Sequence, residues 1–186
     1  MQEFQNLSVA FNLLAIEIMN TEIKERPLKK VCIICAKGTI EDVYATLVLA
    51  NGAVMEGIEA KLFFTFFGLD AITKKQMNKI HTGTVGNPAM RMPGGLPFPS
   101  VLGMLPGVEA GVSAMMKSQM AALDIPPVGE FLEMITAGGG EVYACKLAMD
   151  MFKLEAKDLW DGCSGVLTVG DFYAMCGGEN TQIIFT

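Results

Sequence analysis

Two short apolar segments with a helical segment between them place the strongest constraint on the fold. KVCIICAKG runs from Lys30 to Gly38, and IEAKLFFTFFGLD runs from Ile58 to Asp70. Both have the continuous apolar character of strands that are buried on two faces. The segment between them begins at Thr39, a helix-capping residue, and ends at Gly57. A strand, a helix and a strand at this spacing predict a βαβ unit with parallel strands.

The same alternation continues along the rest of the chain. The expected helices span 71–80, 110–123, 128–140, 146–154 and 165–178, and the further expected strands span 141–145 and 181–186. Alternation of this kind predicts an α/β fold with a mostly parallel sheet and helices on both faces, of the flavodoxin-like or Rossmann-like type. A chain of 186 residues suits one domain, so we expect a single domain over 1–186.

Two segments fall outside this alternation. Residues 1–28 form a helical extension by pattern, because apolar side chains recur three and four residues apart, at Phe4, Leu7, Phe11, Leu14 and Ile18. The stripe lasts fewer than three heptads, so we expect it to cover the protein's own core rather than to form a coiled coil between two subunits. Residues 83–108 form a long loop rich in glycine, proline and methionine, and a loop of that length needs a functional reason.

Charge and composition exclude several classes of function. The net charge is −6, and no dense stripe of basic side chains exists to displace counterions from a phosphate backbone, so we expect no nucleic-acid partner. The N-terminus lacks the basic head of a signal peptide, and the uncharged stretch 92–108 carries four prolines, so we expect a cytoplasmic protein without a transmembrane segment. Five cysteines are too few and too irregularly spaced for a disulfide scaffold, which favours reduced thiols.

Cys145 is the candidate nucleophile. Ligands of open α/β sheets bind beyond the carboxyl ends of the strands, and Cys145 ends the strand expected over 141–145. The free N–H groups and the dipole of the following helix favour its thiolate, and Lys146 adds a nearby positive charge. The alternative is that Cys145 is a small apolar residue that fills the end of the strand.

The other cysteines have weaker claims. Cys32 and Cys35 have the CxxC spacing of redox proteins, but both lie within a strand and not at a helix start, so we expect them in the core. Cys163 lies in a turn, where it either accepts sulfur from Cys145 or packs in the loop. Cys176 is expected in the core of the last helix.

No motif for a cofactor or a metal is present. The glycines of the chain do not reproduce GxGxxG or the P-loop. His81 is the only histidine, and the cysteines lack close-spaced companions, so a zinc site is not expected. We expect His81 to be a loop residue. Six methionines between Met90 and Met120 form either an adaptable partner surface or internal packing.

Across residues 29–186 the chain resembles the DsrE/DsrF-like family of sulfur-relay proteins, in its longer second DsrE subgroup. The resemblance rests on the strand–helix–strand unit from Lys30 to Leu69, on GNPAMRMPGG with LPGVEAGVSAMMK, and on GGGEVYACKLAMDMFKL. It implies a homo-oligomeric three-layer α/β fold without metal or organic cofactor. It further implies that Cys145 carries sulfane sulfur as a persulfide. The partners implied are rhodanese-type or TusA-type sulfur carriers.

Two functional hypotheses follow. In the first, the protein is a sulfurtransferase that holds sulfur on Cys145, with Cys163 as a possible second station. In the second, it is a non-enzymic binding or scaffold module that docks a partner through the Met-rich segment, and Cys145 serves packing. The reactivity of the Cys145 thiol distinguishes the two.

Overall fold

The computed structural model describes residues 28–85, 91, 96, 98–99 and 103–186. The amphipathic stripe predicted between Phe4 and Ile18 therefore lies outside the described residues. So does most of the central part of the loop predicted over 83–108.

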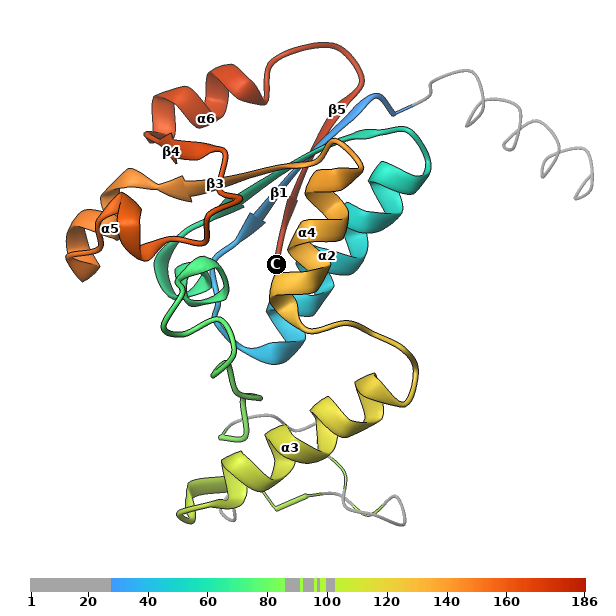
Figure 1. The fold of residues 1–186 in the computed structure, drawn as a ribbon, viewed down its shortest axis with the longest axis vertical. Coiled ribbons are helices and arrows are strands. Elements are labelled where there is room, and N and C mark those ends of the chain that lie inside the picture. The colour runs from blue at the N-terminus through green and yellow to red at the C-terminus, as the bar shows by residue number, and fades with distance from the viewer. Residues whose placement is uncertain (1–27, 86–90, 92–95, 97, 100–102) are drawn as a thin grey trace, which may run out of the picture.

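Five parallel strands form one sheet, as Figure 1 shows. They are β1 (Lys30–Cys35), β2 (Glu59–Phe64), β3 (Glu141–Cys145), β4 (Gly165–Leu167) and β5 (Thr181–Phe185), in the spatial order β4-β3-β2-β1-β5. In the register, Cys35 lies beside Phe64, and Phe64 lies beside Ala144. The predicted α/β class with a parallel sheet is confirmed.

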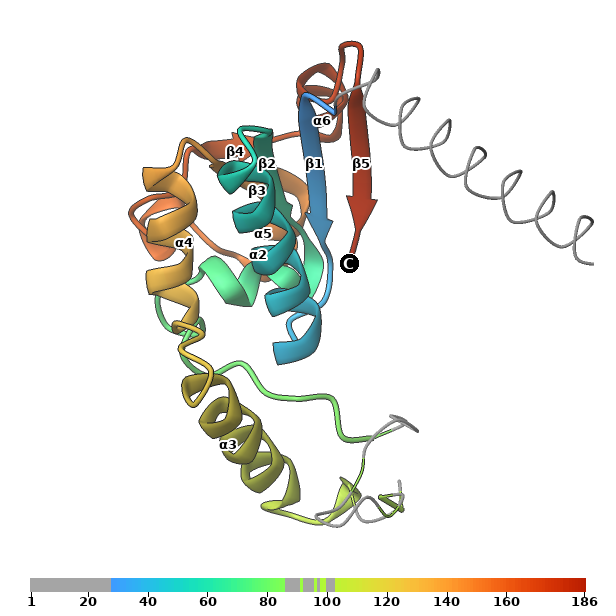
Figure 2. The ribbon, with the colours of Figure 1, turned by 90° about the vertical axis from the view of Figure 1, so that its right-hand side faces the viewer.

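Helices cover both faces of the sheet. On one face lie α2 (Ile40–Met55) and α4 (Val128–Ala137), which pack against each other, and on the other lie α5 (Lys146–Phe152) and α6 (Val169–Met175) (Figure 2). The ring of Phe172 in α6 lies 4.7 Å from that of Phe63 in β2. Side chains alternate along a strand, so Leu62 and Phe64 point to the α2 and α4 face.

Helix α2 begins where the sequence predicts. The side chain of Thr39 accepts a hydrogen bond from the backbone N–H of Asp42 and donates one to its carboxylate. Val43 and Leu47 are buried on the face toward the sheet. Gly57 follows the helix in the left-handed region at φ 72°, where glycine carries no steric cost.

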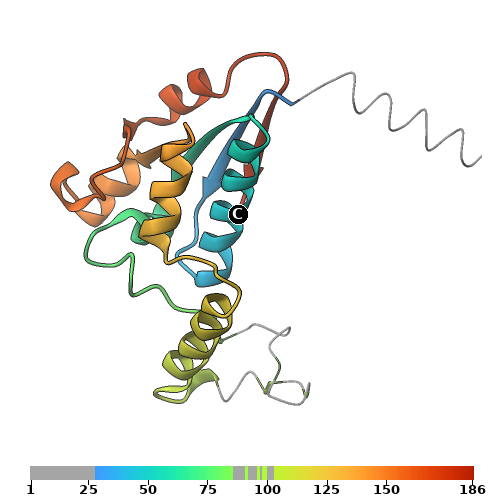
Figure 3. The same cartoon turned by 45° about the vertical axis from the view of Figure 1, so that its right-hand side comes forward.

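Helix α3 (Val108–Ala121) projects beyond the sheet and the helices that cover it, past the carboxyl edge of the sheet (Figure 3). Ser113 is its buried residue, and its hydroxyl accepts a hydrogen bond from the N–H of Thr82. Across the described part of the chain, no helix is long and apolar enough to cross a membrane.

The helix predicted over 71–80 is wrong. The 3-10 helix η1 (Phe66–Ile72) comes first, and turns follow it. Thr73 forms an antiparallel bridge with Leu159, Lys74 donates its N–H to Asp158, and Ile72 accepts from Trp160. These bonds occupy backbone groups that an α-helix would need for its own ladder.

The helix predicted over 165–178 is also wrong at its start. Gly165–Leu167 is strand β4, paired with the second half of β3, and α6 begins only after Thr168. Thr168 and Asp171 form a capping box, in which each side chain accepts a backbone hydrogen bond from the other residue. A helix start at Thr168 leaves the three preceding residues free to pair with β3.

The loops that follow β1 and β2 interlock at the carboxyl edge. A Cβ atom at Gly68 would lie 2.2 Å from the carbonyl oxygen of Cys35, and one at Gly38 would lie 2.5 Å from that of Phe67. Only glycine permits these backbones to approach so closely. The two glycines therefore fix the position of η1 against the end of β1.

We expect Gly68→Ala to lower the free energy of unfolding by about 1–3 kcal/mol, because the added methyl group meets backbone and not a flexible side chain. Urea denaturation measures the change. Gly170→Ala is the matched control. Gly170 is exposed in α6, so alanine there should be neutral or stabilising by up to about 1 kcal/mol. Equal effects at both positions would show that the two loops can separate freely.

Candidate functional site

The carboxyl ends of the strands gather the candidate residues at one edge of the sheet. The parallel order brings together the loop after β1, η1 after β2 and α5 after β3. Both β3 and α5 contact η1. In α/β sheets this edge is where ligands bind.

Cys145 lies at this edge, as the sequence predicts. It is the last residue of β3, lies beside Leu167 of β4, and is the N-cap residue of α5 with extended backbone angles. Its side chain makes no capping hydrogen bond. The first N–H groups of an α-helix have no partner within the helix, so the thiol lies next to backbone donors that it does not use for capping. The residue is buried, with only 4% of its surface exposed.

Lys146 does not act on Cys145 as a lone positive charge. Its ammonium group binds the carboxylate of Asp150, one helical turn along α5, and both side chains are more than half exposed. The carboxylate offsets the charge that the sequence suggested would favour a thiolate. The N-terminal peptide groups of α5, a helix of seven residues, remain as positive partial charges beside Cys145.

Exposed apolar side chains surround the approach to this edge. They come from η1 and α5 and form what we call the apolar rim: Phe66, Phe67, Leu147, Met151 and Phe152. The rings of Phe67 and Phe152 lie 5.6 Å apart and join the two elements. Clustered apolar exposure of this kind is typical of a surface that meets another molecule.

Two residues of η1 belong to this edge and were not identified as candidates from the sequence. Phe66 has φ 44°, a left-handed conformation that is uncommon for a bulky side chain and often marks a functional site. Burial raises the pKa of the Asp70 carboxyl above its ordinary value. The signal available for Asp70 was its place as the charged residue that ends the apolar run 58–70, whereas the conformation of Phe66 has no signature in the sequence.

Cys163 lies away from Cys145. Its thiol donates to the carbonyl oxygens of Val142 and Gly165, both at 3.5 Å. Val142 is near the start of β3 and Cys145 is at its end, about 10 Å along the strand. Burial raises the pKa of the Cys163 thiol, which favours the protonated form. The structure thus does not bring the two candidate thiols together.

The remaining cysteines are in the core, as predicted. Cys32 and Cys35 are fully buried in β1, and Cys176 is buried at the end of α6. Burial raises the pKa of Cys32 to about 12, and a hydrogen bond with Cys176 contributes to that rise. Burial also raises the pKa of Cys35. Neither thiol of the CxxC pair is a ready nucleophile.

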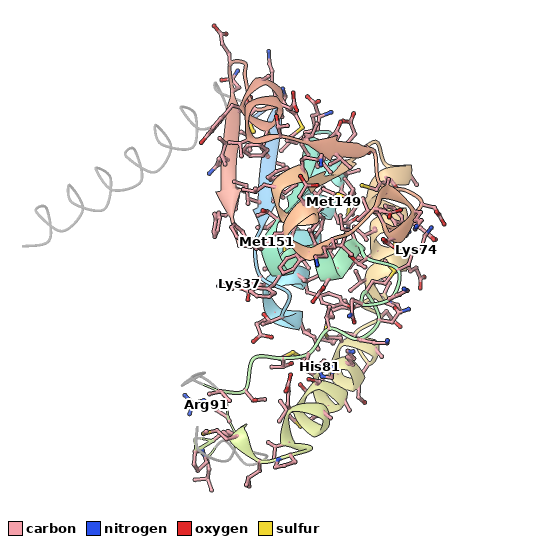
Figure 4. All side chains as sticks on the ribbon, turned by 90° about the vertical axis from the view of Figure 1, so that its left-hand side faces the viewer. Lys37, Lys74, His81, Arg91, Met149 and Met151 are labelled. Atoms are coloured by element: carbon pink, nitrogen blue, oxygen red, sulfur yellow. The ribbon has the colours of Figure 1, made fainter. Side chains whose placement is uncertain are left out.

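His81 is a loop residue, as predicted, and lies apart from the thiol site. Figure 4 shows His81 beside α3, well away from Met149 and Met151 of α5. Its imidazole lies 3.9 Å from the carboxylate of Glu109, and its carbonyl oxygen accepts a hydrogen bond from Ile40. It does not pair with Cys145.

The Met-rich segment divides between the two predicted roles. Met116 and Met120 pack against the core, whereas Met104 and Met115 are exposed. Met90 and Met92 lie outside the described residues. Both packing and an exposed surface are therefore present.

Comparison with known proteins identifies relatives along most of the chain. The model of the DsrE/DsrF/DrsH-like family matches residues 27–184. The chain is 35% identical over 137 residues to the sulfur carrier protein DsrE2 of Allochromatium vinosum, which covers 72% of this chain and 84% of that protein. It is 27% identical over 135 residues to the uncharacterized protein YrkE of Bacillus subtilis, which covers 72% and 82% respectively.

A solved structure supports the fold. The ychN protein from E. coli aligns with a TM-score of 0.51 at 15% identity, covering 85% of this chain and 99% of that protein. Similarity at this level of identity bears on the architecture alone, and it agrees with the parallel sheet described above. By the match of the family model to residues 27–184, the chain belongs to the DsrE/DsrF/DrsH-like family.

Proposed function

We propose that this protein is a sulfur-relay protein that carries sulfane sulfur as a persulfide on Cys145. The observation that carries the proposal is the position of Cys145 at the carboxyl end of β3, against the first turn of α5. The similarity to a protein named as a sulfur carrier supports the same role. The proposed setting is the cytoplasm, where thiols stay reduced.

The proposed transfer is a thiol exchange. The Cys145 thiolate attacks the outer sulfur of a donor persulfide, R–S–SH. A bond forms between Sγ and that sulfur, the donor's S–S bond breaks, and the donor leaves as a thiolate. The products are Cys145–S–SH and R–S⁻, with no net oxidation. An acceptor thiolate then takes the outer sulfur by the same exchange and restores the Cys145 thiolate.

The surroundings of Cys145 suit such a carrier. N–H groups of the first turn of α5 would stabilise both the thiolate and a persulfide anion. The low exposure of Cys145 would keep the outer sulfur from oxidants in bulk water. Since the carboxylate of Asp150 binds Lys146, the backbone of α5 would supply most of the stabilisation.

The apolar rim would be the surface on which a donor or acceptor protein docks. Its aromatic and aliphatic side chains belong to the two elements that flank Cys145. A partner that displaced Leu147 or Phe152 would gain access to a thiol that bulk solvent barely reaches. Rhodanese-type or TusA-type sulfur carriers are the proposed partners, and we propose a homo-oligomer as the working form.

Exposed methionines favour a second candidate function. Met104 is 72% exposed and Met115 is 40% exposed. Thioether side chains adapt to varied partner surfaces. The protein would then be a scaffold that docks a partner through this segment, and Cys145 would serve packing.

Loading with a persulfide donor tests the carrier function. After removal of excess donor under non-reducing conditions, we expect the wild-type protein to gain the mass of one sulfur atom on Cys145, measured by intact-protein mass spectrometry. Cys145→Ser should gain none, because a hydroxyl does not accept sulfane sulfur in this exchange. The matched variant Cys163→Ser should load as the wild type does. Equal loading of wild type and Cys145→Ser would exclude the proposal.

Alkylation rates separate the carrier from the scaffold. At neutral pH we expect one thiol of the wild-type protein to react rapidly with iodoacetamide. This rapid reaction should be absent in the Cys145→Ser variant. Cys163 should react slowly, because its raised pKa leaves little thiolate, and its rate should rise about tenfold per pH unit below that pKa. Peptide mapping assigns each rate. Slow alkylation of Cys145 at neutral pH would favour the scaffold.

Substitution in the apolar rim tests the docking surface. We expect Leu147→Asn to slow sulfur transfer from a carrier protein about tenfold, because a polar amide replaces an exposed apolar contact. Loading from a small persulfide should be unchanged, since it needs no protein surface. Leu123→Asn is the control, because Leu123 is similarly exposed but follows α3. Equal slowing by both variants would argue against a role for the rim.

A further inference from the structure

An apolar groove runs along the outer side of α2, on the face of the sheet opposite α5 and α6. It has a volume of about 420 Å³, and we call it the α2 groove. Its lining includes Leu28, Val48, Leu49, Gly52, Met55 and Ile184. Val48 is 54% exposed and Met55 is 78% exposed. The groove is thus an apolar surface that no described residue covers fully.

The α2 groove lies over the edge of the sheet, where a further helix would cover β5. β5 is an edge strand, and Ile184 lies beside Ile33 in the register, so both point to the α2 and α4 face. α2 packs over β1 and β2, and α4 packs on α2. Among the described residues, no helix covers β5 on this face. A parallel sheet is ordinarily covered on both faces.

Gly52 supplies an independent observation. It lies in the interior of α2, where glycine costs roughly 0.5–1 kcal/mol relative to alanine. A Cβ atom at Gly52 would meet no atom of the described residues within 4 Å. The described part of the chain therefore gives no reason for glycine here, whereas a second helix packed closely on α2 would.

The chain itself offers an occupant. Leu28, the first described residue, is part of the groove, so residues 1–27 enter the fold at that point. Those residues carry the apolar stripe Phe4, Leu7, Phe11, Leu14 and Ile18. As a helix, residues 4–18 would be about 22 Å long, close to the length of α2. The nine residues between the stripe and Leu28 can span up to about 30 Å, which is enough to reach any part of the groove.

We propose that residues 4–18 pack as an amphipathic helix in the α2 groove of the same chain, with the stripe against Val48, Leu49 and Gly52. The segment precedes the match of the family model, which begins at residue 27, so this helix would be an addition to the family fold. It would complete the layer formed by α2 and α4 and would cover the edge strand β5 on that face.

Hydrogen exchange of the full chain, followed by mass spectrometry, tests the proposal. We expect amides 4–18 of the wild type to exchange at least about tenfold more slowly than those of a synthetic peptide of residues 1–27. Gly52→Leu should abolish this protection and lower Tm, because its side chain would occupy the space that the segment needs. Gly111→Leu is the matched control. Gly111 lies in α3, where a Cβ atom would likewise meet no described atom within 4 Å, and leucine there should leave Tm unchanged or raise it.

A second pair of variants lies in the segment and leaves the groove intact. Leu14→Glu should remove the protection, because it places a charge in the stripe. Asn12→Glu should retain it, because residue 12 is on another side of the predicted helix. Exchange of residues 4–18 at peptide rates in the wild type would overturn the proposal, as would a Gly52→Leu variant that is stabilised like Gly111→Leu. Protection that falls on dilution would also overturn it, since the occupant would then come from a second copy.

Discussion

Strand β2 makes ladder hydrogen bonds with β1 on one side and β3 on the other, and its side chains from Ala60 to Phe64 are buried on both faces of the sheet. The position of every functional element depends on this ladder. It aligns the ends of β1, β2 and β3 within one residue of each other. The loop after β1 and η1 then approach so closely that Gly38 and Gly68 have no room for a side chain. α5 therefore begins beside η1, and Cys145, the last residue of β3, lies where α5 and β3 both contact η1.

The local patterns that predicted the fold correctly are those that burial dictates. β1 and β2 are continuous apolar runs because both faces of a central strand are covered, and Thr39 and Gly57 mark the ends of α2. The two wrong elements depend on contacts between distant segments. Residues 71–80 have a helical composition, but the backbone around their start forms hydrogen bonds with the backbone of residues 158–160. Strand β4 has three residues, too few for any periodic signal, although the capping box at Thr168 does mark the start of α6.

The site could be predicted only in part for a similar reason. The location of Cys145 follows from topology, since the residue after a buried parallel strand lies at the binding edge. Lys146 is adjacent to Cys145 in the chain, yet its ammonium group binds Asp150, four residues along the same helix. The i, i+4 spacing of the pair was a signal in the sequence that this charge is offset. The apolar rim, in contrast, could not be predicted, because Phe67 and Phe152 are 85 positions apart and meet only after the sheet has formed.

The cysteines of this chain differ in their surroundings, and the difference bears on the proposal that Cys145 carries sulfur. Burial raises the pKa of Cys32, Cys35 and Cys163 and holds these thiols in the protonated form. Cys145 is also buried, but it is the N-cap residue of α5 and lies at the carboxyl edge of the sheet, where ligands of α/β proteins bind. Under the proposed function, those three protonated thiols would compete weakly with Cys145 for the sulfur of a donor persulfide. Specificity would then come from the protonation of these thiols together with the position of Cys145 beside the apolar rim, where a partner protein would dock.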